Sequence, residues 1–511
     1  MEKRTFVAII LSIGILILWQ WFYGPKQPKP IGKVESPVIT EKGPVLKDDG
    51  RARKDTTYKD VVPADKKTIE TFNIETDKII YVLSEDEASI IHCYLKEKKS
   101  TEKNMVDLVL SNKLVNDTGS GIWTRIVDKN QKYQAKFIKT IGDFNIEKSF
   151  YFNNDSYLVK LQYVIKNITG SKKTFNGLQF SIGPGLGTDA KEMKENKGLL
   201  RAITYSQKKV EKLKIGDYPF PEKWAGIDNR YFLCVFFKEE QIIKNIKVEE
   251  EEKIPAMNFY TETMDFLPNE KKNLLINFYA GPKGYTRLKH VKVNEQNPQL
   301  QKAVDFGFFG DLGELALSTL NYIYKITGNY GWAIVIISVI LNIIFFPLSK
   351  KSFKSANAMK SVQEDVKRVQ LKYKSDPKKM NTEIWALYKS KGVNPFGGCL
   401  PMLVQLPIFW ALFTMLRNAY ELRGAPFMFW VTDLSAKDPY YVLPILMGAG
   451  MYFQQKMTTS ASDPTQKQMM ILMPVIFTIM FMGFPSGLVI YWLTNSIVTV
   501  VEQWLVLKKG K

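Results

Sequence analysis

Hydrophobic residues are gathered into a few long runs, separated by polar segments of very different lengths. One run covers Phe6 to Tyr23, and five more fill the last third of the chain. These five cover Trp332 to Leu348, Leu400 to Leu416, Tyr440 to Phe453, Met469 to Phe484 and Leu488 to Leu507. Because about 20 apolar residues in a helix span a bilayer, the pattern predicts a polytopic α-helical membrane protein with six transmembrane helices. The Tyr440 to Phe453 run is short and needs flanking residues or local bilayer thinning.

The first run predicts an N-terminal signal-anchor helix over residues 1–23. A charged Glu-Lys-Arg triplet precedes the run, and aromatic residues from Trp19 to Tyr23 close it, as at a membrane interface. No small-residue cleavage motif follows, which favours an uncleaved anchor with a cytoplasmic N-terminus over a cleaved signal peptide. Six spans then return the basic C-terminal tail to the cytoplasm, in agreement with the positive-inside rule.

A flexible linker and a large β domain are expected between the first two spans. Residues 24–67 are rich in proline and charge, which is typical of an extended linker. Residues 68–299 show short segments of period two, in which for example Tyr157, Val159 and Leu161 alternate with Lys160 and Gln162. Repeated alternation of this kind predicts an all-β sandwich. Because it follows the signal anchor, this domain is expected on the periplasmic side.

Residues 300–328 join the β domain to the second span. Their apolar side chains recur at helical spacing and few charges interrupt them, so we expect an amphipathic helix lying in the membrane interface. A helix packed on the sandwich is the alternative.

The loop between the second and third spans carries the strongest basic cluster. From Lys350 to Gly392 there are twelve Lys and Arg and four acids, a net charge of 12 − 4 = +8, which places this loop in the cytoplasm. Apolar residues step by three and four on both sides of Asp376-Pro377, a cap followed by a first-turn proline. The pattern predicts a cytoplasmic helical hairpin, residues 350–392. Its basic residues form either a solvated face or a docking surface for an anionic partner, for which the candidates are Lys360, Lys367, Arg368, Lys372, Lys378 and Lys379.

Composition narrows the classes of chemistry. The net charge of +20 favours a polyanionic neighbour such as nucleic acid, the ribosome or anionic lipid. Three cysteines without a CxxC pair, and only two histidines, speak against a zinc site and a His-dependent hydrolase, so no metal or cofactor is expected. The Gly-rich stretch 183–187 lacks the residues of a phosphate-binding loop and is expected to be a turn. Cys93 and Cys234 are either a disulfide or two free buried thiols.

The C-terminal spans contain an unusual number of polar residues and prolines. Polar groups in lipid are costly unless they are paired or face water, so several are expected to line a wet interior, with interhelical hydrogen bonding as the alternative. The polar residues in or at the ends of the runs are Ser338, Asn342, Gln405, Thr414, Arg417, Thr478, Thr494 and Asn495.

These spans closely resemble the YidC family of membrane protein insertases, in the Gram-negative form with a large periplasmic domain. The resemblance covers residues 328–507 and rests on four groups of residues. They are Gly328 to Trp332, Val393 to Pro401 (VNPFGGCLP), Gln405 to Phe409 (QLPIF), and Phe484 to Leu488 (FPSGL) with Tyr491 and Trp492.

The resemblance implies an insertase core over residues 329–511, made of five helices around a hydrophilic groove that is open to the cytoplasm and to lipid. Incoming membrane segments would slide past an apolar surface while their polar ends cross through the groove, without nucleotide hydrolysis or catalytic residues. The implied groove and slide residues are Ser338, Asn342, Gln405, Leu406, Phe409, Leu412, Tyr491 and Trp492. The implied partners are nascent membrane proteins, the Sec translocon, the ribosome, the signal recognition machinery and anionic lipids, without a nucleic-acid function beyond ribosomal contact.

One departure from the family concerns the second span, where many relatives have an Arg or Lys and this chain has Asn342. A neutral amide can hydrate a groove but cannot attract an acidic terminus by Coulomb force, and we expect the charge of the relatives' basic residue to be dispensable here.

Two rival classes of protein are less well supported. A secondary transporter should show internal repeats and an acidic coupling site in the membrane, but we find no clear repeat and expect no Asp or Glu inside the spans. A membrane-tethered enzyme needs a cluster of catalytic residues in the β domain, and none is evident.

Overall fold

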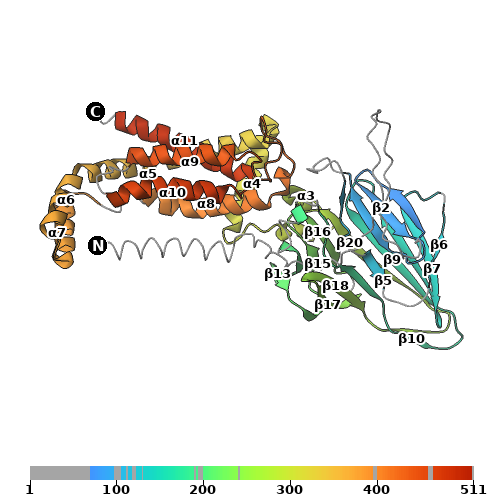
Figure 1. Cartoon of the computed structure of the whole chain (residues 1–511). Helices are drawn as coiled ribbons and strands as arrows, with labels where there is room; N and C mark the ends of the chain where they lie inside the picture. The colour runs from blue at the N-terminus through green and yellow to red at the C-terminus, as the bar shows by residue number, and fades with distance from the viewer. Residues whose placement is uncertain are drawn as a thin grey trace, which may run out of the picture.

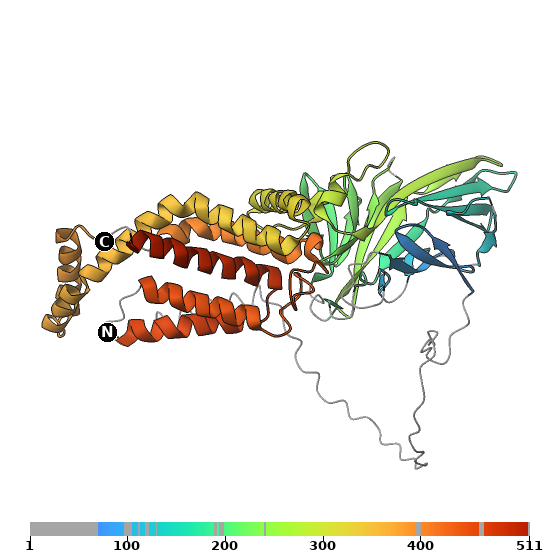
Figure 2. The same ribbon diagram turned by 90° about the horizontal axis from the view of Figure 1, so that it is seen from above.

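The computed structural model describes residues 70–96, 105–110, 113–117, 122–128, 130–188, 192–193, 199–239, 242–394, 400–458 and 464–508. The predicted signal anchor, the linker, Cys399 and the last three residues of the basic tail lie outside these ranges. A β domain forms one end of the elongated molecule and a bundle of helices forms the other (Figures 1 and 2).

The β domain contains two nine-stranded antiparallel sheets and a two-stranded ribbon. The first sheet has the order β1 (Thr71–Glu75), β2 (Ile79–Ser84), β3 (Ile90–Leu95), β5 (Lys113–Asp117), β11 (Gln179–Gly183), β18 (Ile254–Thr261), β17 (Ile243–Glu251), β14 (Gly216–Pro219), with β4 (Val106–Asp107) beside β3. The second has the order β13 (Lys209–Leu213), β12 (Arg201–Ser206), β15 (Trp224–Asp228), β16 (Phe232–Phe237), β20 (Lys271–Pro282), β9 (Leu158–Asn167), β8 (Phe144–Phe152), β7 (Gln134–Ile141), β6 (Thr124–Ile126). The ribbon pairs β10 (Lys173–Phe175) with β19 (Met264–Phe266).

The two sheets face each other across an apolar core, so the all-β prediction is confirmed. Along β9 the side chains of Val159, Leu161 and Tyr163 are fully buried while Lys160 is exposed, as the alternation predicted. Aromatic rings join the sheets, for example Phe180 of β11 and Phe236 of β16, whose centroids lie 4.9 Å apart. Cys93 and Cys234 are both buried and free, which decides between the two alternatives for this pair.

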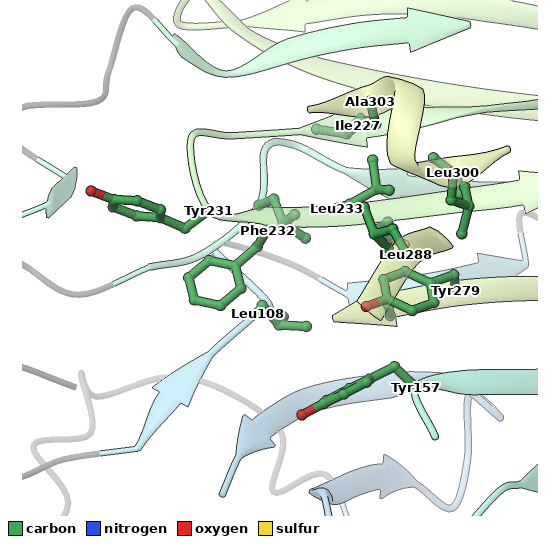
Figure 3. Packing of buried hydrophobic residues seen from close by; sticks show 14 of the residues in the cluster. Leu108, Tyr157, Ile227, Tyr231, Phe232, Leu233, Tyr279, Leu288, Leu300 and Ala303 are labelled. Atoms are coloured by element: carbon green, nitrogen blue, oxygen red, sulfur yellow. The ribbon is translucent and has the colours of Figure 1, made fainter. Parts of the chain in front are cut away.

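Two short helices cover the second sheet where the chain leaves the β domain. They are α3 (Tyr285–Lys289) and the 3₁₀ helix η2 (Leu300–Ala303). Leu288, Leu300 and Ala303 are buried and gather with side chains of β15, β16 and β20, among them Leu233 and Tyr279 (Figure 3). This segment is therefore packed on the sandwich.

The amphipathic helix expected over residues 300–328 is shorter than predicted. Helix α4 covers Gly310–Thr327, and an irregular segment separates it from η2. Gly307 has a φ of +72° and its N–H donates to the Asp305 carboxylate (2.9 Å), a turn that ends the preceding helical segment. One face of α4, with Leu317 and Leu320, is buried against α5 and α8, while Leu315 and Ile326 are more than half exposed.

The helical bundle contains α5 (Tyr330–Ser361), α8 (Leu400–Asn418), α9 (Val442–Thr458), α10 (Pro464–Phe481) and α11 (Ser486–Lys508), with the 3₁₀ helix η3 (Tyr420–Leu422) after α8. Helix α11 packs against α5 and α9, and α10 packs against α9. In the described part of the chain, Tyr330–Ser361 and Ser486–Val506 are long and apolar enough to cross a membrane, and Ile471–Phe481 is a shorter apolar helix.

A basic hairpin lies at the end of the bundle far from the β domain (Figure 1), but it is shorter than the predicted residues 350–392, because residues 350–361 continue α5. It is formed by α6 (Gln363–Lys372) and α7 (Pro377–Ser390), and α5 continues as one helix up to its base. The Asp376 side chain accepts hydrogen bonds from the backbone N–H groups of Lys378 and Lys379, so the predicted cap of α7 is confirmed.

Candidate functional site

The candidate site lies along the seam between α8 and α11, next to α5. Gln405 and Phe409 lie one turn apart on α8, and Trp492 and Asn495 lie almost one turn apart on α11. Residues at such spacings share a helix face. The seam therefore brings a polar pair and an aromatic pair into adjacent layers.

The polar layer contains Gln405 and Asn495. The Gln405 Nε2 donates to Asn495 Oδ1 at 3.3 Å. Gln405 and Asn495 are half-buried, whereas Tyr491 is 3% exposed. Polar residues of the spans were expected either to line a wet interior or to form interhelical hydrogen bonds, and Gln405 forms an interhelical hydrogen bond.

The aromatic layer contains Phe409 and Trp492. Their ring centroids lie 4.9 Å apart and the ring planes are nearly perpendicular, the edge-to-face geometry that aromatic pairs prefer. Phe477 and Phe481 of α10 complete the cluster, with centroids 5.9 and 5.2 Å from that of Trp492. The result is an apolar surface built from α8, α10 and α11.

The other predicted slide residues differ in exposure. Leu406 is 50% exposed, and Phe409 and Trp492 are half-buried, so these three contribute to the accessible surface. Leu412 is 2% exposed. It and Tyr491 support the seam from inside rather than forming its accessible face.

Ser338 and Asn342 of α5 are hydrogen-bonded within their own helix. The Ser338 hydroxyl donates to the carbonyl of Ile334 (2.6 Å), and the Asn342 amide donates to the carbonyl of Ser338 (2.8 Å). Ser338 is fully buried and Asn342 is half-buried. Such bonds satisfy polar side chains inside a bilayer, and they leave the Asn342 carbonyl oxygen as an acceptor.

The sequence did not predict the importance of two polar residues, Asn495 and Glu502. Asn495 was noticed only as a polar residue in an apolar run, because its partner Gln405 is 90 positions away. Glu502 lies inside α11 and is 8% exposed, so the expectation that the spans contain no acid is wrong. The position of Glu502 within the last hydrophobic run was the signal that could have revealed it.

The candidate docking residues of the hairpin are mostly accessible. Arg368, Lys372, Lys378 and Lys379 are exposed, and Lys367 is half-buried. Lys360 differs, because its Nζ donates to the carbonyl of Met457 near the end of α9 (2.6 Å). This cation therefore caps a helix C-terminus, where positive charge is favourable.

The opposite end of the bundle is attached to the β domain by buried polar contacts. The Arg423 guanidinium is 1% exposed and forms a paired contact with Glu192, with Nε–Oε1 at 2.6 Å and Nη2–Oε2 at 3.1 Å. Arg230 of the β domain donates from Nε to the carbonyl of Arg417 at 2.8 Å. The β domain therefore closes on the end of α8 that lies opposite the hairpin.

Comparison with known proteins agrees with this architecture. Residues 322–511 match the family described as the 60Kd inner membrane protein, and residues 95–315 match the YidC periplasmic domain. A membrane protein insertase YidC from Endomicrobium trichonymphae is 39% identical over 100% of this chain and 98% of its own length. The chain belongs to the YidC family of membrane protein insertases. It is thus an inner membrane protein with a periplasmic domain.

Further relatives cover the same length. The membrane protein insertase YidC of Geotalea uraniireducens (strain Rf4) is 34% identical over 98% of both chains. Among solved structures, an active YidC insertase with the first transmembrane domain resolved is 19% identical, covering 85% of this chain and 92% of its own, with a TM-score of 0.40.

Proposed function

We propose that this chain inserts membrane segments at the seam between α8 and α11, where polar and apolar surfaces lie in adjacent layers. The observation that carries the proposal is that the Gln405–Asn495 hydrogen bond and the Phe409–Trp492 ring contact lie about one helical turn apart along α8 and α11. The aromatic layer offers an apolar face to an incoming helix, and the polar layer offers hydrogen-bonding groups to its hydrophilic end.

The proposed mechanism requires neither a nucleotide nor a catalytic residue. Desolvation opposes the passage of a polar stretch through hydrocarbon, and a groove that carries water partway lowers that barrier. Partition of the apolar segment into lipid then drives insertion, by about 0.8 kcal/mol for each buried CH₂. In the described part of the chain, no three His, Cys, Asp or Glu side chains form a group that could hold a metal ion.

We further propose six spans, with the signal anchor followed by α5, α8, α9, α10 and α11, and both termini in the cytoplasm. The position of the hairpin and the β domain at opposite ends of the bundle (Figure 1) supports opposite sides of the membrane for these two parts. In this arrangement the exposed basic residues of α6 and α7 face the cytoplasm. We propose them as the docking surface for the ribosome, the signal recognition machinery, Sec or anionic lipid, and leave out Lys360 because of its contact with Met457.

The proposal is tested by insertion of a small single-span client into proteoliposomes that contain only this purified chain. Phe409→Asp and Trp492→Asp place a charge on the apolar face and are expected to abolish insertion. Phe429→Asp is the matched control, because Phe429 is 81% exposed and lies in the loop between α8 and α9. Absence of insertion by a folded wild-type chain, or equal loss with the control, would contradict the seam as the insertion path.

A further inference from the structure

Glu502 is the one acidic residue in α5 and in the four helices from α8 to α11. It is 8% exposed, and within the described residues it makes no hydrogen bond or ion pair. Acidic residues inside membrane-spanning helices are costly, and they normally mark a functional site. Its place inside α11 therefore requires an explanation.

The periodicity of α11 places Glu502 on the same face as the polar layer. Asn495 and Glu502 are seven residues apart, which is two helical turns or about 10.5 Å along the axis. Thr499 lies between them, and its hydroxyl donates to the Asn495 carbonyl (2.7 Å). A polar row thus extends from the Gln405–Asn495 pair toward the hairpin end of the bundle.

Two neighbouring side chains each have a buried polar atom without a partner. Ser496 and Gln503 are 1% and 2% exposed, and neither the Ser496 hydroxyl nor the Gln503 Oε1 has a hydrogen-bond partner in the described structure. Buried polar atoms are nearly always paired in proteins. This half of α11 therefore has unused capacity to bind a polar group, and the charge of Glu502 selects a cation.

The distance between Trp492 and Glu502 along α11 indicates which residue of a client helix could reach Glu502. Trp492 and Glu502 are ten residues apart, or about 15 Å along the helix axis, and Glu502 lies in the last two turns of α11. A client helix that packs along α11 from the aromatic layer toward the hairpin end would therefore bring the residue that flanks its cytoplasmic end close to Glu502. Long Lys and Arg side chains can extend several ångströms along the helix to reach such a position.

We propose that Glu502 binds the Lys or Arg that flanks the cytoplasmic end of an inserting segment and holds that flank on the cytoplasmic side. The inference rests on the proposed function. Beyond that function, it assigns Glu502 as a residue that determines specificity, and the favoured substrates are clients with a basic cytoplasmic flank.

The test uses the purified full-length chain in vesicles of a zwitterionic lipid and three single-span clients that differ at one flanking position, Lys, Gln or Glu. The wild-type chain is expected to insert the Lys client about five-fold faster than the Glu client, which corresponds to about 1 kcal/mol. Glu502→Gln, which keeps the shape of the side chain, should remove this preference and leave the Gln client unchanged. Glu502→Lys should reverse it.

The matched control is Glu364→Gln, which removes the same charge from an exposed position on α6. An equal effect of this control would assign the preference to bulk charge and overturn the proposal. The proposal would also be overturned if Glu502→Gln still inserted the Lys client faster than the Glu client. It would be overturned as well if Glu502→Gln inserted all three clients equally more slowly, because that result indicates a structural role of Glu502 or an ion pair with the chain's own lysines. Failure of the wild type to insert even the Gln client would instead contradict the proposed function itself.

Discussion

At the scale of single residues, α5 carries the neutral Asn342 at a position where the family resemblance leads us to expect a basic residue. Asn342 already donates to the carbonyl of Ser338, so its role in the structure is satisfied without a charge. The apolar face and the Gln405–Asn495 pair do not depend on it.

We therefore predict that Asn342→Arg changes the insertion rate of a client with an acidic translocated tail less than two-fold. An introduced cation would attract the acidic tail, but water in the proposed groove would screen most of that attraction. The measurement is protease protection of the tail in proteoliposomes, with Asn342→Gln as the uncharged control. A large gain with arginine alone would show that the charge is needed for such clients.

Another residue-scale prediction concerns His92 of β3, whose Nδ1 lies 2.6 Å from Oδ2 of Asp107. The hydrogen bond to Asp107 raises the pKa of His92 above its ordinary value. Because the folded-state pKa is raised, the stabilisation is fully present below the ordinary histidine pKa of about 6.5 and is lost as pH rises through the folded value. Both side chains are partly exposed, which limits the effect to under about 1 kcal/mol.

Asp107→Asn should lower the pKa of His92. The chain has only two histidines, so NMR of histidine-labelled protein gives two titrating signals, and His290→Gln assigns them. An unchanged pKa of His92 in Asp107→Asn would contradict the attribution to this hydrogen bond.

At the scale of elements, the crossing of α9 and α10 depends on the absence of a side chain at Gly448. A Cβ at this position would lie 1.9 Å from Thr478 Oγ1. The Thr478 hydroxyl also donates to the carbonyl of Pro474 (2.8 Å), so it cannot rotate away without losing that bond.

Gly448→Ala should therefore destabilise the bundle by about 1–3 kcal/mol, the usual effect of overpacking. The measurement is thermal unfolding in detergent. Gly483→Ala is the control, because its nearest neighbour would lie 3.9 Å away. Thr478→Ala combined with Gly448→Ala should recover most of the loss, and strictly additive losses would disprove the clash.

At the scale of the whole molecule, the β domain and the bundle are joined by a buried ion pair rather than by the connecting chain alone. Arg423 follows η3 and Glu192 belongs to the β domain, 231 positions earlier. The guanidinium also lies over the ring of Phe232, 5.2 Å from its centroid. This contact fixes the β domain on the end of α8.

Removal of one partner of a buried ion pair costs about 3–5 kcal/mol, because the other charge stays buried. Glu192→Gln should therefore lower the midpoint of thermal unfolding and make the connecting segments more sensitive to protease. Asp365→Asn is the control, since in the described part of the chain Asp365 pairs only with the exposed cations Arg368 (3.6 Å) and Lys391 (3.4 Å), and the loss of such an exposed pair costs at most about 1 kcal/mol. Equal sensitivity of the two variants would show that the interface does not depend on the buried pair.

The amino-acid sequence alone determined the features that depend on local periodicity. Alternation along β9 predicted half-buried strands, Asp376-Pro377 predicted the start of α7, and the run that became α11 predicted a long apolar helix, because each signal lies within one element. Motif resemblance then indicated three of the four residues of the seam, Gln405, Phe409 and Trp492.

Only the tertiary structure decided how those residues meet. The Gln405–Asn495 bond, the Phe409–Trp492 contact and the Arg423–Glu192 pair each join positions more than 80 residues apart, and no local pattern encodes such pairings. The burial of Glu502 and the contact that engages Lys360 were hidden for the same reason. The hydrophobic pattern specifies which face of a helix is buried, but packing against other elements decides which polar side chains on that face find partners and which remain available to a client.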